Sequence, residues 1–158
     1  MRGVFRHRGT PNFQFYLQTR SFCKCLNNGW SVFIEVAFDI VNSLLSIHDG
    51  EMTPEKIGIV TPYAAQVSYF KRMFANKRIY KGLEIKSVDG YQGREKEVII
   101  FSTVRSNEFG NVGFVADKRR INVALTRARR GLVVVGNYDV MCFLFCWLSG
   151  GWDFTWGQ

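Results

Sequence analysis

Three segments of the sequence combine hydroxyl, amide, glycine and charged side chains in patterns that suit the binding of phosphate groups. The first is residues 57–66, where an apolar run ends in Thr61, Pro62 and Tyr63 and is followed by Gln66. A strand that ends in this way presents a hydroxyl, a phenol and an amide at the edge of a sheet. The alternative is an ordinary strand-to-helix connection without a ligand.

Two further segments add glycine and arginine. In residues 87–97, Gly93 allows backbone amides to approach a phosphate closely, and Glu95 can accept a hydrogen bond from a ribose hydroxyl. Residues 119–130 hold five arginines on a predicted helix, and Asp117 is the only acid close by in the sequence, so ion pairs do not account for all five. Arginine offers a planar, permanently charged fork that suits phosphoryl groups. The alternatives are a solvated charged loop and a basic helix that faces solvent.

The charge of the chain is concentrated in the same part of the sequence. The 158 residues carry a net charge of +8, and residues 71–130 hold 15 of the 21 basic residues but 6 of the 13 acidic ones. This segment therefore has a net charge of +9. Such a balance indicates a polyanionic partner, which can be a nucleic acid, a nucleotide or an acidic membrane surface.

Composition excludes several classes of protein. The apolar fraction of 47% is too high for a disordered chain, and the length suits one domain. The four cysteines lie too far apart for a zinc site and are expected to be free thiols in a reducing compartment. No signal peptide is expected, and the longest apolar run, residues 140–148, is too short to span a bilayer.

Short apolar strands alternate with amphipathic helices along the middle of the chain, which predicts an α/β fold with a parallel sheet covered by helices on both faces. The expected strands are residues 57–60, 83–88, 98–104 and 132–135, and the expected helices are residues 35–46, 63–75 and 117–129. Loops are expected at residues 91–96 and 106–113. Ligands of such sheets bind at the carboxyl ends of the strands, where residues 61–63, the 91–96 loop and Arg105 are expected to lie.

Two runs of sequence carry a specific resemblance. Residues 88–100 read V-D-G-Y-Q-G-R-E-K-E-V-I-I, and residues 119–129 read R-R-I-N-V-A-L-T-R-A-R. In wording, order and spacing they resemble motifs of the second RecA-like domain of superfamily 1 helicases. The most similar group is that of the nonsense-mediated-decay helicase, senataxin and the immunoglobulin mu-binding protein helicase. The resemblance covers residues 57–137, and it extends more weakly back to Glu35.

The resemblance implies a single RecA-like lobe of an ATP-driven translocase on single-stranded RNA or DNA. By its place in the motif, Arg127 matches the arginine finger, and it is the expected catalytic residue. The other residues expected to bind nucleotide are Gln92, Gly93, Arg94 and Glu95. Those expected to bind the nucleic acid are Thr61, Pro62, Tyr63, Ser87, Arg105 and Asn107. The implied cofactor is ATP with Mg²⁺, and the implied location is the cytoplasm or nucleus.

The sequence also departs from the pattern of these helicases. Their first RecA-like domain carries a Gly-Lys-Ser/Thr phosphate loop and an Asp-Glu pair for magnesium, and this chain has neither a Gly-Lys nor an Asp-Glu dipeptide. We therefore expect the magnesium ligands on a first RecA-like domain that acts in cis or in trans, and no metal site in this chain. Phe33 also replaces the arginine expected two residues before Glu35.

The motifs predict three parts: a weakly structured extension over residues 1–34, the helicase domain over residues 35–140, and an aromatic, diverged tail over residues 141–158. We expect a fragment of a helicase that does not hydrolyse ATP alone, as from a truncated or mis-spliced gene model. The first alternative is a non-catalytic module that binds single-stranded nucleic acid. The second is a non-functional fragment that exposes aromatic residues. No membrane partner is expected.

Overall fold

The computed structural model describes residues 4–6, 30–47, 51–75, 77–103, 117–136 and 153–155. Arg105, Asn107, the 106–113 loop, the four cysteines and most of the two terminal segments lie outside the described residues. Two short strands that the sequence did not predict, β1 (Val4–Arg6) and β6 (Asp153–Thr155), pair in antiparallel fashion.

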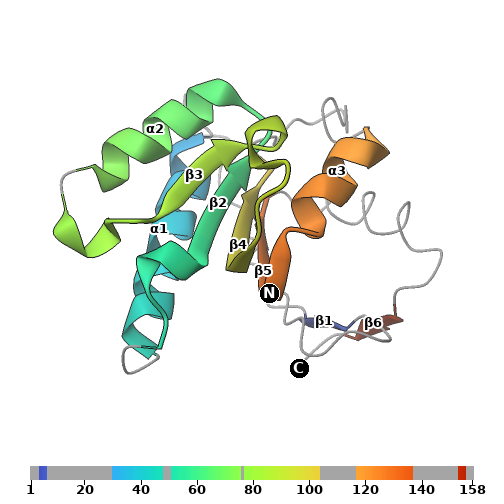
Figure 1. Cartoon of the computed structure of the whole chain (residues 1–158), viewed down its shortest axis with the longest axis horizontal. Helices are drawn as coiled ribbons and strands as arrows, with labels where there is room; N and C mark the ends of the chain where they lie inside the picture. The colour runs from blue at the N-terminus through green and yellow to red at the C-terminus, as the bar shows by residue number, and fades with distance from the viewer. Residues whose placement is uncertain are drawn as a thin grey trace.

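The centre of the structure is a four-stranded parallel sheet with the order β3-β2-β4-β5 (Figure 1). The strands are β2 (Ile57–Thr61), β3 (Glu84–Ser87), β4 (Lys96–Ser102) and β5 (Ala128–Val135). The predicted α/β fold with a parallel sheet is therefore confirmed. The apolar runs missed the charged residues near the start of two strands, which are the partly exposed Lys96 and Glu97 of β4 and the exposed Arg129 and Arg130 that follow Ala128 in β5.

Helices cover both faces of this sheet. They are α1 (Trp30–Ile47), α2 (Ala64–Phe74) and α3 (Lys118–Leu125), with short 3₁₀ turns η1 (Pro54–Lys56), η2 (Arg78–Tyr80) and η3 (Asp89–Tyr91). In Figure 1, α1 lies behind the sheet, and the connection between β3 and β4 passes in front of it.

The handedness of parallel connections explains which segment covers which face. The chain moves from β2 to β3 through α2, and then returns past β2 to reach β4 through η3. Crossovers between parallel strands are almost always right-handed, so a reversal of direction along the sheet places the next connection on the opposite face. The step from β4 to β5 continues in the new direction, so α3 lies on the same face as η3, which it contacts.

Two helices differ in length from the prediction. The first begins at Trp30 rather than Glu35, because Ile34, only 1% exposed, extends the buried face of α1. The third ends at Leu125 rather than at residue 129, because Ala128 pairs with Lys96 as the start of β5. The last arginines of the predicted basic helix therefore lie on a strand.

One face of the sheet packs against α1 and α2. The apolar side chains of this core come from both helices, from η2 and from all four strands, and the rings of Phe38, Phe70, Phe74 and Tyr80 cluster within it. The Phe74 and Tyr80 rings meet edge to face with their centroids 4.8 Å apart, and Phe38 lies 5.3 Å from Phe74. The buried residues of this core are Ile34, Ala37, Val41, Ile57, Ile59, Phe70, Phe74, Tyr80, Ile85, Val98, Ile100, Val133 and Val135.

On the other face of the sheet, Gly58 of β2 lies close to Tyr91 of η3. Tyr91 is fully buried, and a Cβ atom placed on Gly58 would lie 2.0 Å from its Oη atom and 2.8 Å from Cδ1 of Ile99. Residue 58 must therefore be glycine for the ring to lie this close to the strand. The Tyr91 hydroxyl is buried, and it finds no hydrogen-bond partner among the described residues. Burial, followed by the nearby Glu84 carboxylate, raises the pKa of Tyr91, so this hydroxyl stays protonated.

We predict that Gly58→Ala destabilises the protein by about 1–3 kcal/mol, because the new methyl group overlaps the Tyr91 ring and forces it to move. Tyr91→Phe alone should be neutral or stabilising, because it removes a buried hydroxyl without a partner. In the Tyr91→Phe background, Gly58→Ala should lower the free energy of unfolding by less than it does in the wild-type background. Urea unfolding of the four proteins measures this double-mutant cycle.

Gly131→Ala in β5 is the matched control. A Cβ atom there would lie 3.7 Å from Cγ2 of Val98, an ordinary van der Waals contact, so this strand glycine should tolerate alanine. Equal destabilisation by the two glycine substitutions, or strict additivity of Gly58→Ala and Tyr91→Phe, would show that the contact with Tyr91 does not constrain the strand.

Candidate functional site

The residues expected to bind nucleic acid come together at the carboxyl edge of the sheet, as far as the structure describes them. Thr61 ends β2 and pairs in register with Ser87, the last residue of β3. Pro62 and Tyr63 follow directly and lead into α2. Pro62, Tyr63 and Ser87 are each partly exposed, so this edge offers a ring, a phenol and a hydroxyl to a ligand.

Thr61 has a different environment from its neighbours. Its side chain is fully buried and hydrogen-bonded to the amide of Gln66, whose Nε2 atom donates to Oγ of Ser102 at 3.0 Å. The three residues belong to β2, α2 and β4, and they lie where the order of the strands reverses. Open α/β sheets bind ligands at this position. Here, however, the side chains of Thr61, Gln66 and Ser102 hydrogen-bond to one another, and Thr61 supports the turn that carries Pro62 and Tyr63.

The sequence analysis expected Gln66 at this edge but did not include it among the candidate binding residues. It did not identify Ser102 at all. Ser102 ends β4 directly after the apolar run of residues 98–101. Both Gln66 and Ser102 are fully buried, each 0% exposed. The available signal was a polar residue at the carboxyl end of a buried strand. That signal would have identified Ser102.

The segment after β3 connects the two edges of the sheet. Val88 N donates to O of Thr61 at 3.1 Å, and Gly90 N donates to Oγ of Ser87 at 3.2 Å, so the segment begins at the carboxyl edge. It then passes Tyr91 and reaches Lys96, the first residue of β4. We call residues 88–95 the crossover.

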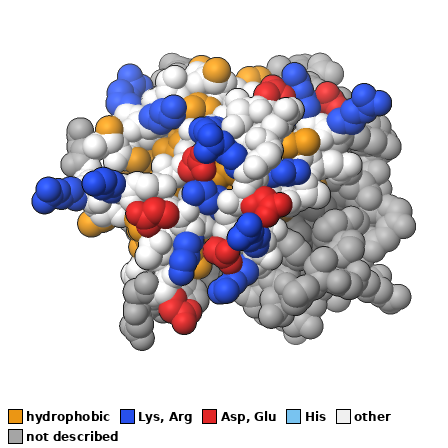
Figure 2. Space-filling view, viewed as in Figure 1, with side chains coloured by type: hydrophobic (Ala, Val, Ile, Leu, Met, Phe, Trp, Pro, Cys, Tyr) orange, Lys and Arg blue, Asp and Glu red, His pale blue; other side chains and the backbone are white. Residues whose placement is uncertain are grey.

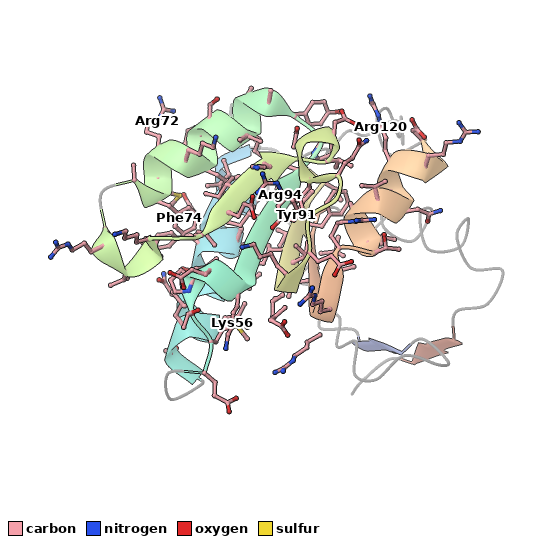
Figure 3. The ribbon with its side chains drawn as sticks, viewed as in Figure 1. Lys56, Arg72, Phe74, Tyr91, Arg94 and Arg120 are labelled. Atoms are coloured by element: carbon pink, nitrogen blue, oxygen red, sulfur yellow. The ribbon has the colours of Figure 1, made fainter. Side chains whose placement is uncertain are left out.

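The expectation that the whole 91–96 loop lies at the carboxyl edge is therefore wrong. Arg94 pairs with Glu84, the first residue of β3, and Lys96 begins β4, so this end of the loop lies at the amino edge. The reason is topological: a chain that leaves one parallel strand must return to the amino edge before the next strand can begin. Figure 3 shows Tyr91 and Arg94 close together along the crossover.

Glu84 is the centre of an ion cluster at this amino edge. Its carboxylate, 16% exposed, pairs with Arg94, with Nζ of Lys86 at 3.1 Å and with Nζ of Lys96 at 3.4 Å. Burial opposes its ionisation, but hydrogen bonds from Lys86 and Lys96 outweigh this effect and lower the pKa of Glu84. Arg94 thus holds the end of the crossover against β3.

Three of the five arginines in residues 119–130 are neutralised by acids from elsewhere in the chain. Arg120 lies 3.3 Å from Asp89 and 3.7 Å from Asp117, while Arg129 pairs with Glu95 at 3.0 Å. Arg130 pairs with Glu97 at 2.8 Å. Ion pairs thus account for three of the five side chains, because η3, the crossover and β4 bring acids alongside that lie far away in the sequence.

Arg127 is held differently. Its Nε atom donates to O of Val123 at 3.0 Å and its Nη2 atom to Oγ1 of Thr126 at 3.2 Å. No Asp or Glu among the described residues forms a salt bridge with it. The partly buried guanidinium is therefore fixed in position while its charge stays uncompensated within the described part of the chain.

Arg127 lies at the same edge as the end of the crossover. Lys96 N donates to O of Arg127 at 3.1 Å, which joins the starts of β4 and β5. Gly93 has a φ of 72°, and nothing lies within 4 Å of the position of a Cβ atom on it, so its backbone is open to a ligand. Gln92, Gly93, Arg94 and Glu95 are all exposed. Of the candidate nucleotide residues, Arg94, Glu95 and Arg127 thus lie at the amino edge. The described candidate nucleic-acid residues lie at the carboxyl edge.

The described residues contain neither a cluster of metal ligands nor a membrane-spanning helix. No group of three or more His, Cys, Asp or Glu side chains in that part of the chain is placed to hold a metal ion. No helix there is both long and apolar enough to cross a membrane.

Comparison with known proteins gives concordant matches. Residues 30–139 match the family described as AAA domain. DNA polymerase alpha-associated DNA helicase A of Saccharomyces cerevisiae is 55% identical over 85 residues, and the ATP-dependent helicase upf1 of Schizosaccharomyces pombe is 52% identical over 99 residues. The Regulator of nonsense transcripts 1 homolog of Drosophila melanogaster is 48% identical over 99 residues.

These relatives are much longer than the matched segment. The three alignments cover 54–60% of this chain but only 12%, 11% and 8% of the respective relatives. The family match covers well over half of the chain and includes every strand of the parallel sheet together with α1, α2 and α3. The chain therefore belongs to this AAA domain family, and its identification as the C-terminal RecA-like domain of a superfamily 1 helicase is confirmed.

Proposed function

We propose that this chain is the second RecA-like half of an ATP-dependent helicase, with the nucleotide at its amino edge and the single strand at its carboxyl edge. The observation that carries the proposal is the state of Arg127, which is fixed by Val123 and Thr126 and forms no salt bridge with a described Asp or Glu. A cation positioned before the ligand arrives stabilises developing charge without the cost of reorganisation.

The amino edge fits the phosphate part of a nucleotide. ATP supplies a γ-phosphoryl group whose oxygens carry the charge that a catalytic arginine stabilises. Arg127 would direct its remaining guanidinium donors at those oxygens, and the open backbone at Gly93 would lie beside them. Arg94 is engaged with Glu84, and Glu95 with Arg129, so these two residues position the loop in the state described.

The magnesium ion does not fit this chain alone. The described residues offer no cluster of metal ligands, and the sequence has no Gly-Lys dipeptide for a phosphate loop. The magnesium ligands and the phosphate loop would therefore belong to a first RecA-like domain, supplied in cis or in trans. Arg127 would act across the interface between the two domains.

The carboxyl edge would bind the single strand. Pro62 and Tyr63 extend from a turn that the buried Thr61–Gln66–Ser102 network supports, and Ser87 lies beside Thr61 in the sheet. Backbone phosphates would accept hydrogen bonds from the hydroxyls of Tyr63 and Ser87, which carries no information about the base. Such phosphate contacts also do not touch the 2′-hydroxyl that distinguishes RNA from DNA, so they set no preference between the two.

We predict that the purified chain alone shows no ATP hydrolysis stimulated by single-stranded nucleic acid. Added in trans to the first RecA-like domain of a related helicase, it should restore turnover, and Arg127→Ala should reduce that turnover by about 10³-fold. A coupled phosphate-release assay measures both. Arg119→Ala is the matched control, because this exposed arginine of α3 should leave turnover within about twofold. Turnover by the chain alone that Arg127→Ala abolishes would contradict the need for a second domain.

We predict that binding of a single-stranded oligonucleotide weakens at least tenfold between about 50 and 200 mM salt, because phosphate contacts release counterions. Tyr63→Ala combined with Ser87→Ala should weaken binding several-fold, as measured by fluorescence anisotropy. Tyr69→Ala is the control, since Tyr69 is a tyrosine within α2, 41% exposed and away from the carboxyl edge. An affinity that does not change with salt would argue against phosphate contacts.

The second candidate is a module that binds single-stranded nucleic acid without catalysis. Residues 71–130 hold 15 basic but only 6 acidic residues, and such a segment binds nucleic-acid phosphates without any catalytic group. Salt-sensitive binding without any rescue of hydrolysis in trans would support this candidate over the first.

A further inference from the structure

A pocket outside both edges opens beside β3, the last strand on that side of the described sheet. It has a volume of about 420 Å³ and lies between the end of α2, η2 and the start of β3. Its floor is apolar and includes Phe74, Tyr80, Leu83 and Ile85, and its rim carries Lys71, Lys77, Arg78 and Lys81. In Figure 3, Phe74 lies beneath α2 on the side of this pocket.

The charge of the rim is not neutralised by the described residues. Residues 56–83 contain six Lys and Arg but no Asp or Glu, and no described carboxylate forms a salt bridge with the four rim cations. Glu84 is the nearest acid along the chain, and its carboxylate pairs with Lys86, Arg94 and Lys96 instead. On the other side of this segment, hydrogen bonds from its own backbone and Thr53 lower the pKa of Glu55, with a smaller contribution from Lys81. Figure 2 shows Lys and Arg side chains at the left end of this face, next to hydrophobic side chains.

The α2 helix explains only part of this arrangement. Lys71 and Arg72 in its last turn complement the negative end of the helix dipole. Lys77, Arg78 and Lys81 lie in and around η2, a single 3₁₀ turn, and Nζ of Lys77 lies 5.5 Å from the centroid of the Phe38 ring. All four rim cations are exposed, so their ammonium and guanidinium groups are accessible to a ligand.

We propose that this pocket binds a short acidic peptide segment of a partner protein. Its carboxylates would pair with Lys71, Lys77, Arg78 and Lys81, and one apolar side chain of the peptide would contact Leu83 and Ile85 on the floor. Opposite charge steers such encounters, and an apolar anchor in a pocket supplies most of the affinity.

The state of the aromatic rings favours a peptide over a nucleic acid. Single-stranded nucleic acids bind by stacking bases on exposed ring faces. Phe74 and Tyr80 are each only 5% exposed, and they pack against each other and against Phe38. No face of either ring is therefore open for a base, whereas a side chain of the size of leucine can contact the floor without moving them.

The pocket is independent of the proposed ATPase role. It lies beside β3, whereas Arg127 precedes β5 at the other end of the strand order. It also lies on the face covered by α1 and α2, opposite the crossover.

The test begins with a random peptide library displayed on phage and selected against the full chain. Enriched peptides should carry several Asp or Glu residues around a Leu, Ile, Met or Phe. The most enriched peptide, synthesised with a fluorescent label, then gives an affinity by anisotropy. A version with Ser in place of its apolar residues and a single-stranded oligonucleotide of similar length serve as comparison ligands.

Lys77→Glu combined with Arg78→Glu should weaken binding of the acidic peptide by roughly tenfold. Leu83→Gln should weaken it without changing its dependence on salt, because it alters only the floor. Lys56→Glu is the matched control, an exposed lysine of η1 outside the pocket, and should change the affinity by less than about twofold. Circular dichroism and thermal unfolding confirm that each variant is folded.

Four results would overturn the proposal. The first is that no acidic peptides are enriched, and the second is that the Ser-substituted peptide binds with the same affinity. The third is that Lys56→Glu weakens peptide binding as much as the double charge reversal does. The fourth is that the oligonucleotide binds more tightly than the peptide and that the double charge reversal abolishes its binding. The last result would assign the pocket to a nucleic acid.

Discussion

The contact between Tyr91 and Gly58 is the constraint on which the rest of the site depends. The crossover must leave the carboxyl edge at Ser87 and reach the amino edge at Lys96 within a short segment, and it has to pass directly over β2. Glycine at position 58 lets the Tyr91 ring lie against the strand, which leaves the ring fully buried. Hydrogen bonds to Thr61 and Ser87 fix the start of the crossover, and the ion pair between Arg94 and Glu84 fixes its end.

The arrangement of charges follows from the same topology. Because the crossover and α3 cover one face together, the acids of η3, the crossover and β4 lie beside the arginines that follow them in sequence. Arg120, Arg129 and Arg130 are paired in this way, whereas Arg127 is held by hydrogen bonds to Val123 and Thr126. The uncompensated arginine is thus distinguished from its neighbours by structure, although all of them look alike in the sequence.

Much of the fold could be predicted from the sequence because its strands are short apolar runs and its helices have regular apolar faces. The end of α3 could not, since Ala128 continues the helical spacing of Ile121, Ala124 and Leu125, and only its pairing with Lys96 makes it part of a strand. The prediction that Arg94 lies at the carboxyl edge was wrong for a related reason. The local sequence pattern indicates a loop but does not indicate which edge of the sheet the loop reaches. The Thr61–Gln66–Ser102 network joins three elements, so no local pattern predicts it. The roles of individual residues rest on the motifs and remain predictions.

The central claim is that the nucleotide and the single strand bind at opposite edges of one sheet, which the crossover connects. Photocrosslinking tests it most directly, with an azido-ATP and an oligonucleotide containing 4-thiouridine, both added to the chain in complex with a first RecA-like domain. Mass spectrometry should then find the nucleotide attached within residues 92–95 or next to Arg127, and the oligonucleotide attached near Tyr63 or Ser87. Both ligands attached at one edge, or the two exchanged between the edges, would contradict the account.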